Sequence, residues 1–464
     1  MAHKRPNILW ICTDQQRFDT IGALGNPHVR TPHIDRLVGA GVAFTHAFCQ
    51  SPICTPSRAS FLTGMYPSSV RACTNGNDHW AGAAPLVTRL LAGAGYDCGL
   101  AGKLHLAGAH GRIEPRGDDG YRVFHWSHDP EDQWPAGHAY AEWIGSQGRD
   151  LGELRKDPGS IPPALHQTTW CTERALEFIA AERDEPWLMS VNVFDPHGPL
   201  DPPCAYLERY DPERMPGPLS GAGDEAAHEQ LGKVDGLVRT TAAEARQMQA
   251  AYYAMIELID DNVGRLLAAL EESGQRQDTL VIFMSDHGEM LGDHGLSGKG
   301  CRFYEALVRV PLVLSQPGIL PQGLESRALV ELIDLAPTIL EMAAVAAPER
   351  MQGRSLLPLL SGHGDLQHHR DAVHCEYYRA LNPDVEGRDL DGTYATMIRD
   401  QRYKLVVYHD RDMGELFDLR EDPGEFDNLW DDFGHRDLRF ELMKKNFAAL
   451  AYAVDVGPKQ VTRF

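Results

Sequence analysis

Apolar and polar positions along the chain follow two patterns, short apolar runs of strand length and longer segments of helical period. Four of the apolar runs end in polar or charged residues: PNILWICTD (6–14), YDCGLAGKLHL (96–106), PWLMSVNVFDPH (186–197) and TLVIFMSDHG (279–288). Helical patterns cover residues 86–94, 168–182, 242–272, 331–345 and 438–454. Such alternation is typical of a large, mostly parallel sheet flanked by helices on both faces. We therefore predict an α/β fold.

The four runs end at residues with charged or titratable side chains: Asp14, then Lys103 and His105, then His197, then Asp286 and His287. In open α/β sheets, ligands bind beyond the carboxyl ends of the strands. We therefore expect these side chains to converge on one site, although they are far apart in sequence. Taken alone, a strand-end aspartate more often caps a turn, and His197 in FDPHGP could brace a proline-rich loop. The convergence of the whole set favours a functional site.

The pattern changes near residue 362, where SGHGDLQHHRD (361–371) interrupts the alternation. Two strand-like runs follow, TYATMIRD (393–400) and YKLVVYH (403–409), joined by Gln401 and Arg402. They predict a small antiparallel sheet with a terminal helix. We place a catalytic domain at residues 1–365 and a C-terminal antiparallel-sheet subdomain at residues 366–464. Residues 109–165 and 201–240 show no sustained period and are expected to be long surface excursions that shape substrate access.

At 464 residues the chain exceeds one ordinary compact domain. Its formal net charge of −22 argues against a nucleic acid or an anionic membrane as partner, so an anionic substrate needs a local positive pocket. The apolar run that starts at Ile8 is too short for a signal peptide or a membrane span, and we expect a cytoplasmic protein. The nine cysteines are scattered without CxxC pairs, which indicates neither a disulfide framework nor a zinc site.

One cysteine lies in a distinctive place, the stretch SPICTPSRASFLTG at residues 51–64. Pro56 suits the first turn of a helix, and the N–H groups at a helix N-terminus favour an anion. Cys54 therefore lies where a thiolate or a bound oxyanion would be stabilised. A lone cysteine is more often a buried structural residue, and only its surroundings can favour a reactive role.

Those surroundings resemble a known family. CTPSR followed by ASFLTG resembles the signature of the formylglycine-dependent sulfatases, in which this cysteine is oxidised to an aldehyde after translation by a formylglycine-generating enzyme. The resemblance extends over nearly the whole chain and includes Asp14, Asn75, GKLHLAG (102–108), His197, SDHGEMLGDHGLSGK (285–299) and the C-terminal tail. It implies an alkaline-phosphatase-like fold with a smaller C-terminal domain and, as activity, the hydrolysis of a small-molecule sulfate ester.

The resemblance also implies a role for each matching residue. The hydrated aldehyde formed at Cys54 has two hydroxyls, one that attacks sulfur and one that expels sulfate when the aldehyde re-forms. Together with this residue, the matching ligands of one divalent metal are Asp14, Gln15, Asp286 and His287. The matching cations that hold the sulfate oxygens are Arg58, Lys103 and Lys299. By the same resemblance, His105 takes the proton of the second hydroxyl, His197 protonates the leaving alkoxide, and Asn75 makes a polar oxyanion contact.

Two positions depart from the most familiar arylsulfatases, which have a second aspartate where this chain has Gln15 and an asparagine where it has His287. Choline sulfatases and phosphonate monoester hydrolases share the glutamine, so the chain resembles that branch. A less anionic site with an imidazole makes manganese plausible beside calcium, with magnesium a third choice.

Three functions are compatible with these residues. The first is a sulfate monoester hydrolase, the second a phosphonate monoester or phosphodiester hydrolase on the same scaffold, and the third a non-catalytic anion-binding protein. The phosphonate hydrolases have uncharged hydroxyl residues at the positions of Lys103 and His105, so GKLHLAG favours sulfate. The leaving group and the oligomeric state stay open, and a homo-oligomer is compatible with the sequence.

Overall fold

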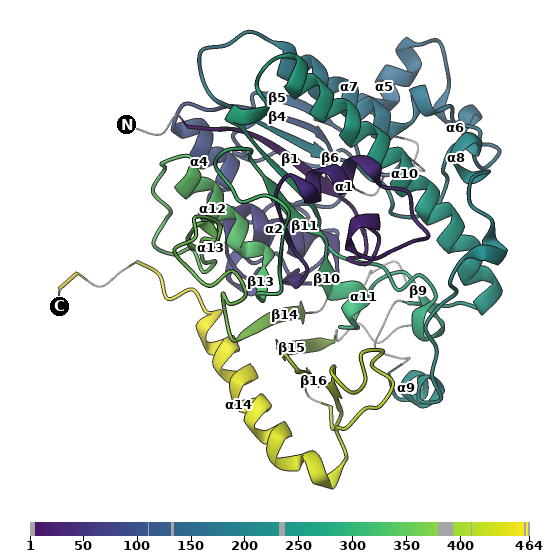
Figure 1. Ribbon diagram of the computed structural model, residues 1–464, viewed down its shortest axis with the longest axis vertical. Coiled ribbons are helices and arrows are strands. Elements are labelled where there is room, and N and C mark those ends of the chain that lie inside the picture. The colour runs from purple at the N-terminus through teal and green to yellow at the C-terminus, as the bar shows by residue number, and fades with distance from the viewer. Residues whose placement is uncertain are drawn as a thin grey trace.

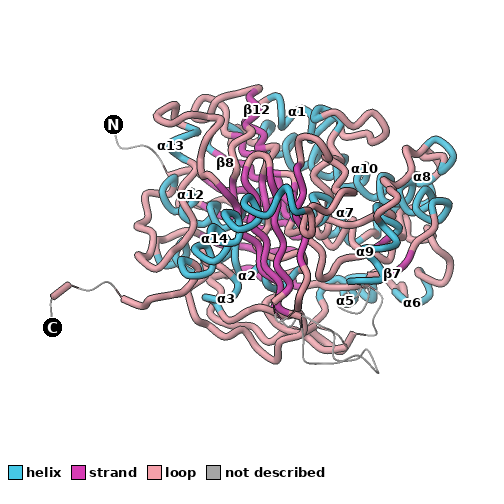
Figure 2. The backbone as a smooth tube through the Cα atoms, turned by 90° about the horizontal axis from the view of Figure 1, so that it is seen from below, coloured by secondary structure: helices cyan, strands magenta, loops and turns pink. Residues whose placement is uncertain are grey.

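The computed structural model describes residues 5–109, 111–130, 134–231, 237–378, 393–409, 411–458 and 461–462. Its centre is an eight-stranded sheet, which Figure 2 shows running through the middle of the molecule with helices on both sides. The strand order is β12 (Leu324–Ser326), β2 (Val42–Phe44), β11 (Leu312–Ser315), β8 (Thr279–Ser285), β1 (Asn7–Thr13), β6 (Trp187–Asn192), β4 (Asp97–Gly102) and β5 (Val123–Trp126). Only β11 runs antiparallel to its neighbours, so the predicted mostly parallel α/β sheet is confirmed.

Alternate residues of the central strand β1 pack into two different cores. Ile8 and Trp10 join the cluster beneath α2 (Cys54–Thr63), α4 (Val87–Gly93) and α12 (Leu335–Met342), whereas Leu9 and Ile11 join the cluster beneath α1 (Pro32–Gly39), α7 (Gln167–Ala180) and α10 (Ala242–Glu272). Because successive strand residues point to opposite faces, a strand covered on both sides is apolar throughout. This is why the run NILWICT has no polar position between Asn7 and the threonine that ends it.

The C-terminal part forms the predicted antiparallel sheet, at the bottom of Figure 1. Its four strands are β14 (Ala372–Tyr378), β15 (Tyr394–Asp400), β16 (Tyr403–Tyr408) and β17 (Gly414–Asp418), and α14 (Arg436–Tyr452) packs against β15 and β16. Val373, Met397 and Tyr408 belong to the same buried cluster as Ile8 and Trp10. The core of this sheet is therefore continuous with that of the large sheet.

Residues 109–165 and 201–240 contain more regular structure than the sequence predicted. The first range holds β5, which extends the main sheet, and the helices α5 (Ala139–Ser146) and α6 (Leu151–Leu154). The second holds α8 (Cys204–Leu207), α9 (Asp224–Leu231) and β7 (Val238–Arg239), which pairs with β9 (Leu296–Ser297). The prediction of pure excursions was wrong because these elements are short, and β5 is an edge strand with largely half-buried side chains and no apolar run.

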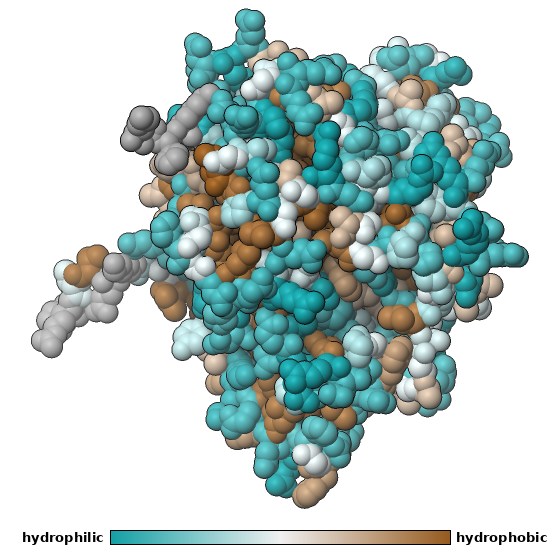
Figure 3. All heavy atoms as spheres, viewed as in Figure 1, coloured by the Kyte–Doolittle hydropathy of each residue, from teal (hydrophilic) through white to brown (hydrophobic). Residues whose placement is uncertain are grey.

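The remaining short elements connect these layers: β3 (Ala47–Phe48), α3 (Pro67–Val70), α11 (Glu305–Val308), β10 (Arg309–Val310), β13 (Val330–Glu331) and α13 (Leu357–Leu360). Hydrophilic residues cover most of the face seen in Figure 3, as expected for a chain of net charge −22. Within the described ranges, every helix is too short or too polar to cross a membrane.

Candidate active site

The four predicted strand ends meet at one edge of the sheet. β8, β1, β6 and β4 are consecutive and parallel, so Asp286, Asp14, His197 and Lys103 all follow strands that end on the same side. Backbone hydrogen bonds join these ends directly, since Asp14 N donates to Asp195 O and Asp286 N donates to Thr13 O. The N-terminus of α2 points into the same region and brings Cys54 to it.

The Cys54 thiol lies at the centre of the group. Its Sγ is 2.8 Å from Lys299 Nζ, 3.2 Å from His287 Nε2, 3.5 Å from Lys103 Nζ and 3.7 Å from Asp14 Oδ1. Burial acts to raise the pKa of the thiol, but the charges of Lys103, Lys299 and His287 outweigh burial and hold that pKa well below its usual range. The site therefore stabilises negative charge at this position.

Two fully buried carboxylates, Asp14 and Asp286, lie beneath the thiol. Arg58, one turn along α2, contacts both: Nε lies 2.8 Å from Asp286 Oδ2 and Nη2 lies 3.3 Å from Asp14 Oδ2. Its third contact is Lys103 O, 2.9 Å from Nη1. Arg58 thus contacts both carboxylates and fixes their orientation.

The donor atoms suit a divalent cation. One ligand atom each from Asp14, Cys54, Asp286 and His287 lies within 4.8 Å of all the others. His287 Nδ1 is 2.9 Å from Gly288 O, an arrangement in which Nδ1 donates and the Nε2 lone pair faces the cluster. Burial lowers the pKa of His287 and the charge of Asp286 raises it, with a net upward shift. Positive charge is therefore favoured at this point, and a metal ion would supply it.

Gln15 completes this donor set. Its backbone has a positive φ of 69°, and its N–H donates to Asp286 Oδ1 at 3.0 Å. The side-chain Nε2 is held by Glu289, while the buried Oε1 has no hydrogen-bond partner within the described ranges. A buried amide oxygen without a donor is costly, and a cation coordinated by it would remove that cost.

The two lysines hold different positions in the site. Lys103 is buried, forms an ion pair with Asp14 and lies 5.1 Å from the centre of the Phe194 ring. Burial lowers the pKa of Lys103, but the charge of the neighbouring Asp14 raises it by a larger amount. The pKa therefore lies above its usual value, and Lys103 stays charged. Lys299 is the more accessible cation, since 15% of its side chain is exposed.

His105 lies beside Lys103 with a left-handed backbone, φ 57°. Burial and the Lys103 charge lower its pKa to about 4, so the imidazole is neutral at pH 7 and can accept a proton. Its ring packs edge-to-face on that of His128, at 4.6 Å between centroids. His197 is half-buried, with Nδ1 2.5 Å from Gly198 O and its ring 4.5 Å from that of Phe194.

Asn75 contacts the helix and not the thiol. Its Oδ1 accepts the Thr55 N–H at 2.9 Å, which satisfies one of the free donors at the start of α2. The geometry thus places Asn75 as a support for the residue next to Cys54.

Four residues of this region were not predicted from the sequence: Glu289, Glu114, His128 and Phe194. Phe194 lies within a quoted strand-end run and Glu289 directly follows another, so their nearness to the site could have been inferred. Glu114 and His128 fall in the range predicted to be irregular, where no period signals their burial.

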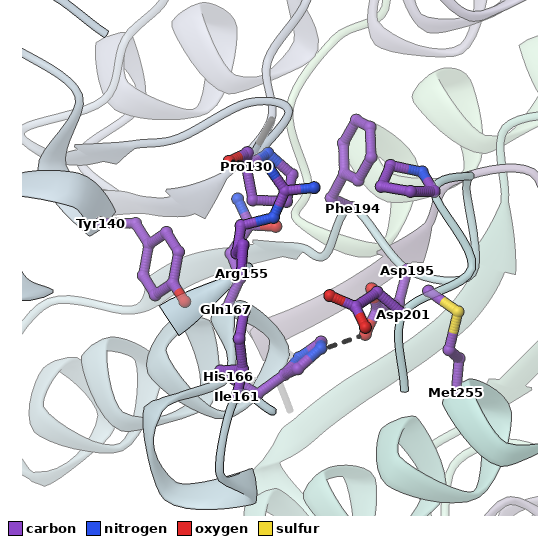
Figure 4. A pocket seen from close by; sticks show the side chains of 11 residues that line it. Pro130, Tyr140, Arg155, Ile161, His166, Gln167, Phe194, Asp195, Asp201 and Met255 are labelled. Atoms are coloured by element: carbon purple, nitrogen blue, oxygen red, sulfur yellow. Dashed lines mark hydrogen bonds and ion pairs between the residues drawn. The ribbon is translucent and has the colours of Figure 1, made fainter. Parts of the chain in front are cut away.

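Figure 4 shows a small pocket whose lining includes none of the candidate metal ligands. Phe194 forms part of its wall, and within it His166 Nδ1 lies 3.4 Å from Asp195 Oδ2. None of the predicted catalytic residues lines it.

Comparisons with known proteins assign the chain to the hydrolases of the alkaline phosphatase superfamily. The sulfatase family profile matches residues 6–345, and that of the N-sulphoglucosamine sulphohydrolase C-terminal region matches residues 292–451. The chain therefore belongs to the sulfatase family, as its sequence predicted.

Two curated relatives and one solved structure illustrate the similarity. An arylsulfatase of Clostridium perfringens is 31% identical over 455 residues, 92% of this chain and 90% of that protein. The multifunctional alkaline phosphatase superfamily protein PehA of Trinickia caryophylli is 32% identical over 520 aligned positions, covering 99% and 97%. The phosphonate monoester hydrolase of Agrobacterium radiobacter superposes with a TM-score of 0.85 at 26% identity, covering 99% and 98%.

Proposed function

We propose that this protein hydrolyses sulfate monoesters and that Cys54 is matured to formylglycine by a formylglycine-generating enzyme. The observation that carries the proposal is the position of Cys54 Sγ, where two lysine ammonium groups and the group of candidate metal ligands meet. A monoanionic ester group bound there would have a cation on two sides.

When present, the divalent ion would lower the pKa of the nucleophilic hydroxyl and polarise the ester group, and the aldehyde hydrate would supply that hydroxyl. Residues of this chain bind the ester group and transfer the protons. Lys103 and Lys299 hold the anionic oxygens, and the neutral His105 accepts a proton from the hydroxyl nearest it. His197, half-buried and on the loop after β6, donates a proton to the departing alkoxide, which leaves as the alcohol.

A second candidate, a phosphonate monoester or phosphodiester hydrolase, is supported by the similarity to the phosphonate monoester hydrolase of Agrobacterium radiobacter. Sulfate monoesters and phosphodiesters both carry a single negative charge, so charge alone does not separate them. Geometry favours the sulfate. A sulfate monoester offers three non-bridging oxygens to the metal and the two lysines, whereas a diester replaces one of these with a bulky group directed at a lysine.

The test uses three substrates with the same aryl leaving group: an aryl sulfate, an aryl phosphonate and an aryl phosphodiester. Protein co-produced with a maturation enzyme should give the highest kcat/KM with the sulfate, and mass spectrometry should show aldehyde in place of thiol at Cys54. Cys54→Ala is the control and should be inactive on all three. A higher kcat/KM with either phosphorus ester would replace the first function by the second, and full activity with an unmodified thiol would contradict the mechanism.

A further inference from the structure

A buried carboxylate on the segment between β4 and β5 accepts four N–H groups. Glu114 Oε2 accepts the backbone N–H of His105 at 2.8 Å and the indole Nε1–H of Trp126 at 2.9 Å. Its Oε1 accepts the backbone N–H of Leu106 at 2.5 Å and that of Ala107 at 3.0 Å. Three of the four donors therefore belong to the chain immediately after Lys103.

The segment that Glu114 holds is in an uncommon conformation. His105 has φ 57°, in the left-handed region that non-glycine residues rarely occupy and keep only when neighbouring structure enforces it. Three successive N–H groups that turn towards one carboxylate provide such enforcement. Without this acceptor the three donors would be buried and unpaired, and the segment would turn elsewhere to satisfy them.

The other end of the segment is fixed by different partners. The Lys103 carbonyl accepts Arg58 Nη1–H and Asn192 Nδ2–H, both at 2.9 Å, and Lys103 N donates to Asn192 O. Lys103 and His105, which reach the thiol from this segment, are therefore held from both sides. Arg58 belongs to the group of residues around Cys54, whereas Glu114 lies outside it.

We propose that Glu114 is a positioning residue, whose carboxylate sets the backbone turn that aims His105, and with it Lys103, at residue 54. The catalytic part of this inference rests on the proposed function. Glu114 itself touches neither the thiol nor the candidate metal ligands through any of its four hydrogen bonds, so its effect is transmitted through His105.

The chemistry of the acceptor gives a sharp substitution. A carboxylate accepts on both oxygens, whereas Glu114→Gln places an NH2 group against two of the four donors while keeping the size of the side chain. In this variant two N–H groups face another donor instead of an acceptor, and no cavity is created. Burial raises the pKa of Glu114, and the four donated hydrogen bonds counteract this by favouring the ionised form.

Asp260→Asn is the matched control. Asp260 is a fully buried carboxylate on α10 that accepts the backbone N–H groups of His33 and Ile34 at 3.0 and 2.7 Å, at the start of α1. It serves the same structural purpose as Glu114 but holds a helix that carries no predicted catalytic residue. Glu114→Gln should lower the thermal midpoint of unfolding, and Asp260→Asn should lower it less, because an asparagine Oδ1 can still accept both N–H groups.

The two variants should differ in catalysis and in local exchange. We expect Glu114→Gln to lower kcat about 100-fold with a smaller change in KM, because the reacting groups are misplaced. Amide hydrogen exchange should become faster at residues 105–107. Asp260→Asn should keep kcat within about twofold of the parent, with faster exchange at residues 33–34 only.

The outcomes separate this inference from the proposed function. If the parent protein hydrolyses none of the three aryl esters, the proposed function fails, and the exchange data alone decide whether Glu114 holds the segment. An active parent and a Glu114→Gln variant of unchanged kcat would overturn the positioning role. If Glu114→Gln does not fold, Glu114→Asp takes its place, with an expected loss of kcat of about tenfold because the shorter side chain withdraws from part of the four contacts.

Discussion

Two of the buried groups of charged residues in the described ranges differ in how their cations are surrounded. One surrounds Cys54. The other lies where the C-terminal sheet meets the large sheet, and there Lys404 Nζ contacts Phe303 O at 2.8 Å, Glu305 Oε1 at 2.8 Å and Glu425 Oε1 at 2.7 Å. Three oxygens therefore surround the ammonium group of Lys404, two of them from carboxylates.

The group around Cys54 is not closed in this way. Lys299 Nζ lies nearest to a thiol sulfur and an imidazole nitrogen, and the buried Oε1 of Gln15 has no hydrogen-bond partner in the part of the chain that the structure describes. A buried cation enclosed by oxygens stabilises a junction, whereas a partly exposed cation beside a thiol and an imidazole is suited to an anionic ligand. The following substitutions test this contrast, beginning with the largest expected effect.

Asp286→Ala should have the largest effect on function. It removes a carboxylate from the candidate metal ligands and leaves Arg58 without its 2.8 Å partner. We expect loss of bound metal in elemental analysis and a fall in turnover of about 1,000-fold or more, since a catalytic metal contributes several kcal/mol. Chelation of the parent protein should have the same effect. Full turnover in a metal-free sample would contradict the assignment.

Lys404→Met should mainly affect stability. It leaves Glu305 and Glu425 buried without their shared cation, and such a loss costs about 3–5 kcal/mol in the free energy of unfolding. Urea unfolding followed by circular dichroism would measure it. The kcat of the folded fraction should stay close to that of the parent, and a large loss of kcat would mean that the two charged groups are coupled.

Lys299→Met is the counterpart in the open group. Its ammonium group is partly exposed and lies 2.8 Å from Cys54 Sγ, so we expect a loss of about 100-fold in kcat/KM from the missing contact to the ester oxygens. The substitution should change the free energy of unfolding of the protein by less than about 1 kcal/mol. A strong loss of stability without a loss of activity would reverse the contrast between Lys299 and Lys404.

Glu415, a buried carboxylate that interacts with the charges of Glu425 and Lys404 in the second group, should give the most pH-dependent effect. Burial raises its pKa to about 7, against the opposing charge of Arg302. The folded state thus favours the protonated form. Its contribution to stability is complete below about pH 4.5 and is lost as the pH rises to about 7, a change of about 3 kcal/mol. The unfolding free energy of Glu415→Gln should therefore rise relative to the parent over this interval, and a constant difference would contradict the shift.

Much of the site could be predicted because parallel strands place their carboxyl ends together. Each of four apolar runs is followed by one residue of the site: Asp14, Lys103, His197 or Asp286. Because the four strands are adjacent in the sheet, their ends bring these side chains together. The roles of Arg58 and Asn75 were harder to predict, since the contacts of Arg58 with two carboxylates and of Asn75 with Thr55 depend on where α2 docks. Glu114 could not be found, because a glutamate in an irregular, charged segment has no pattern that indicates burial.

The sequence by itself determined the α/β class, the family signature around Cys54 and the chemical identity of the residues at the strand ends, because apolar period and residue type are local properties. Only the tertiary structure decided which charges face each other, which polar atoms stay unpaired, and how the Glu114 carboxylate turns the backbone of His105. The charge pairs depend on contacts between segments tens to hundreds of residues apart, and the turn at His105 depends on a contact nine residues away in the chain. All of them depend on burial, which strengthens a paired charge and penalises an unpaired one.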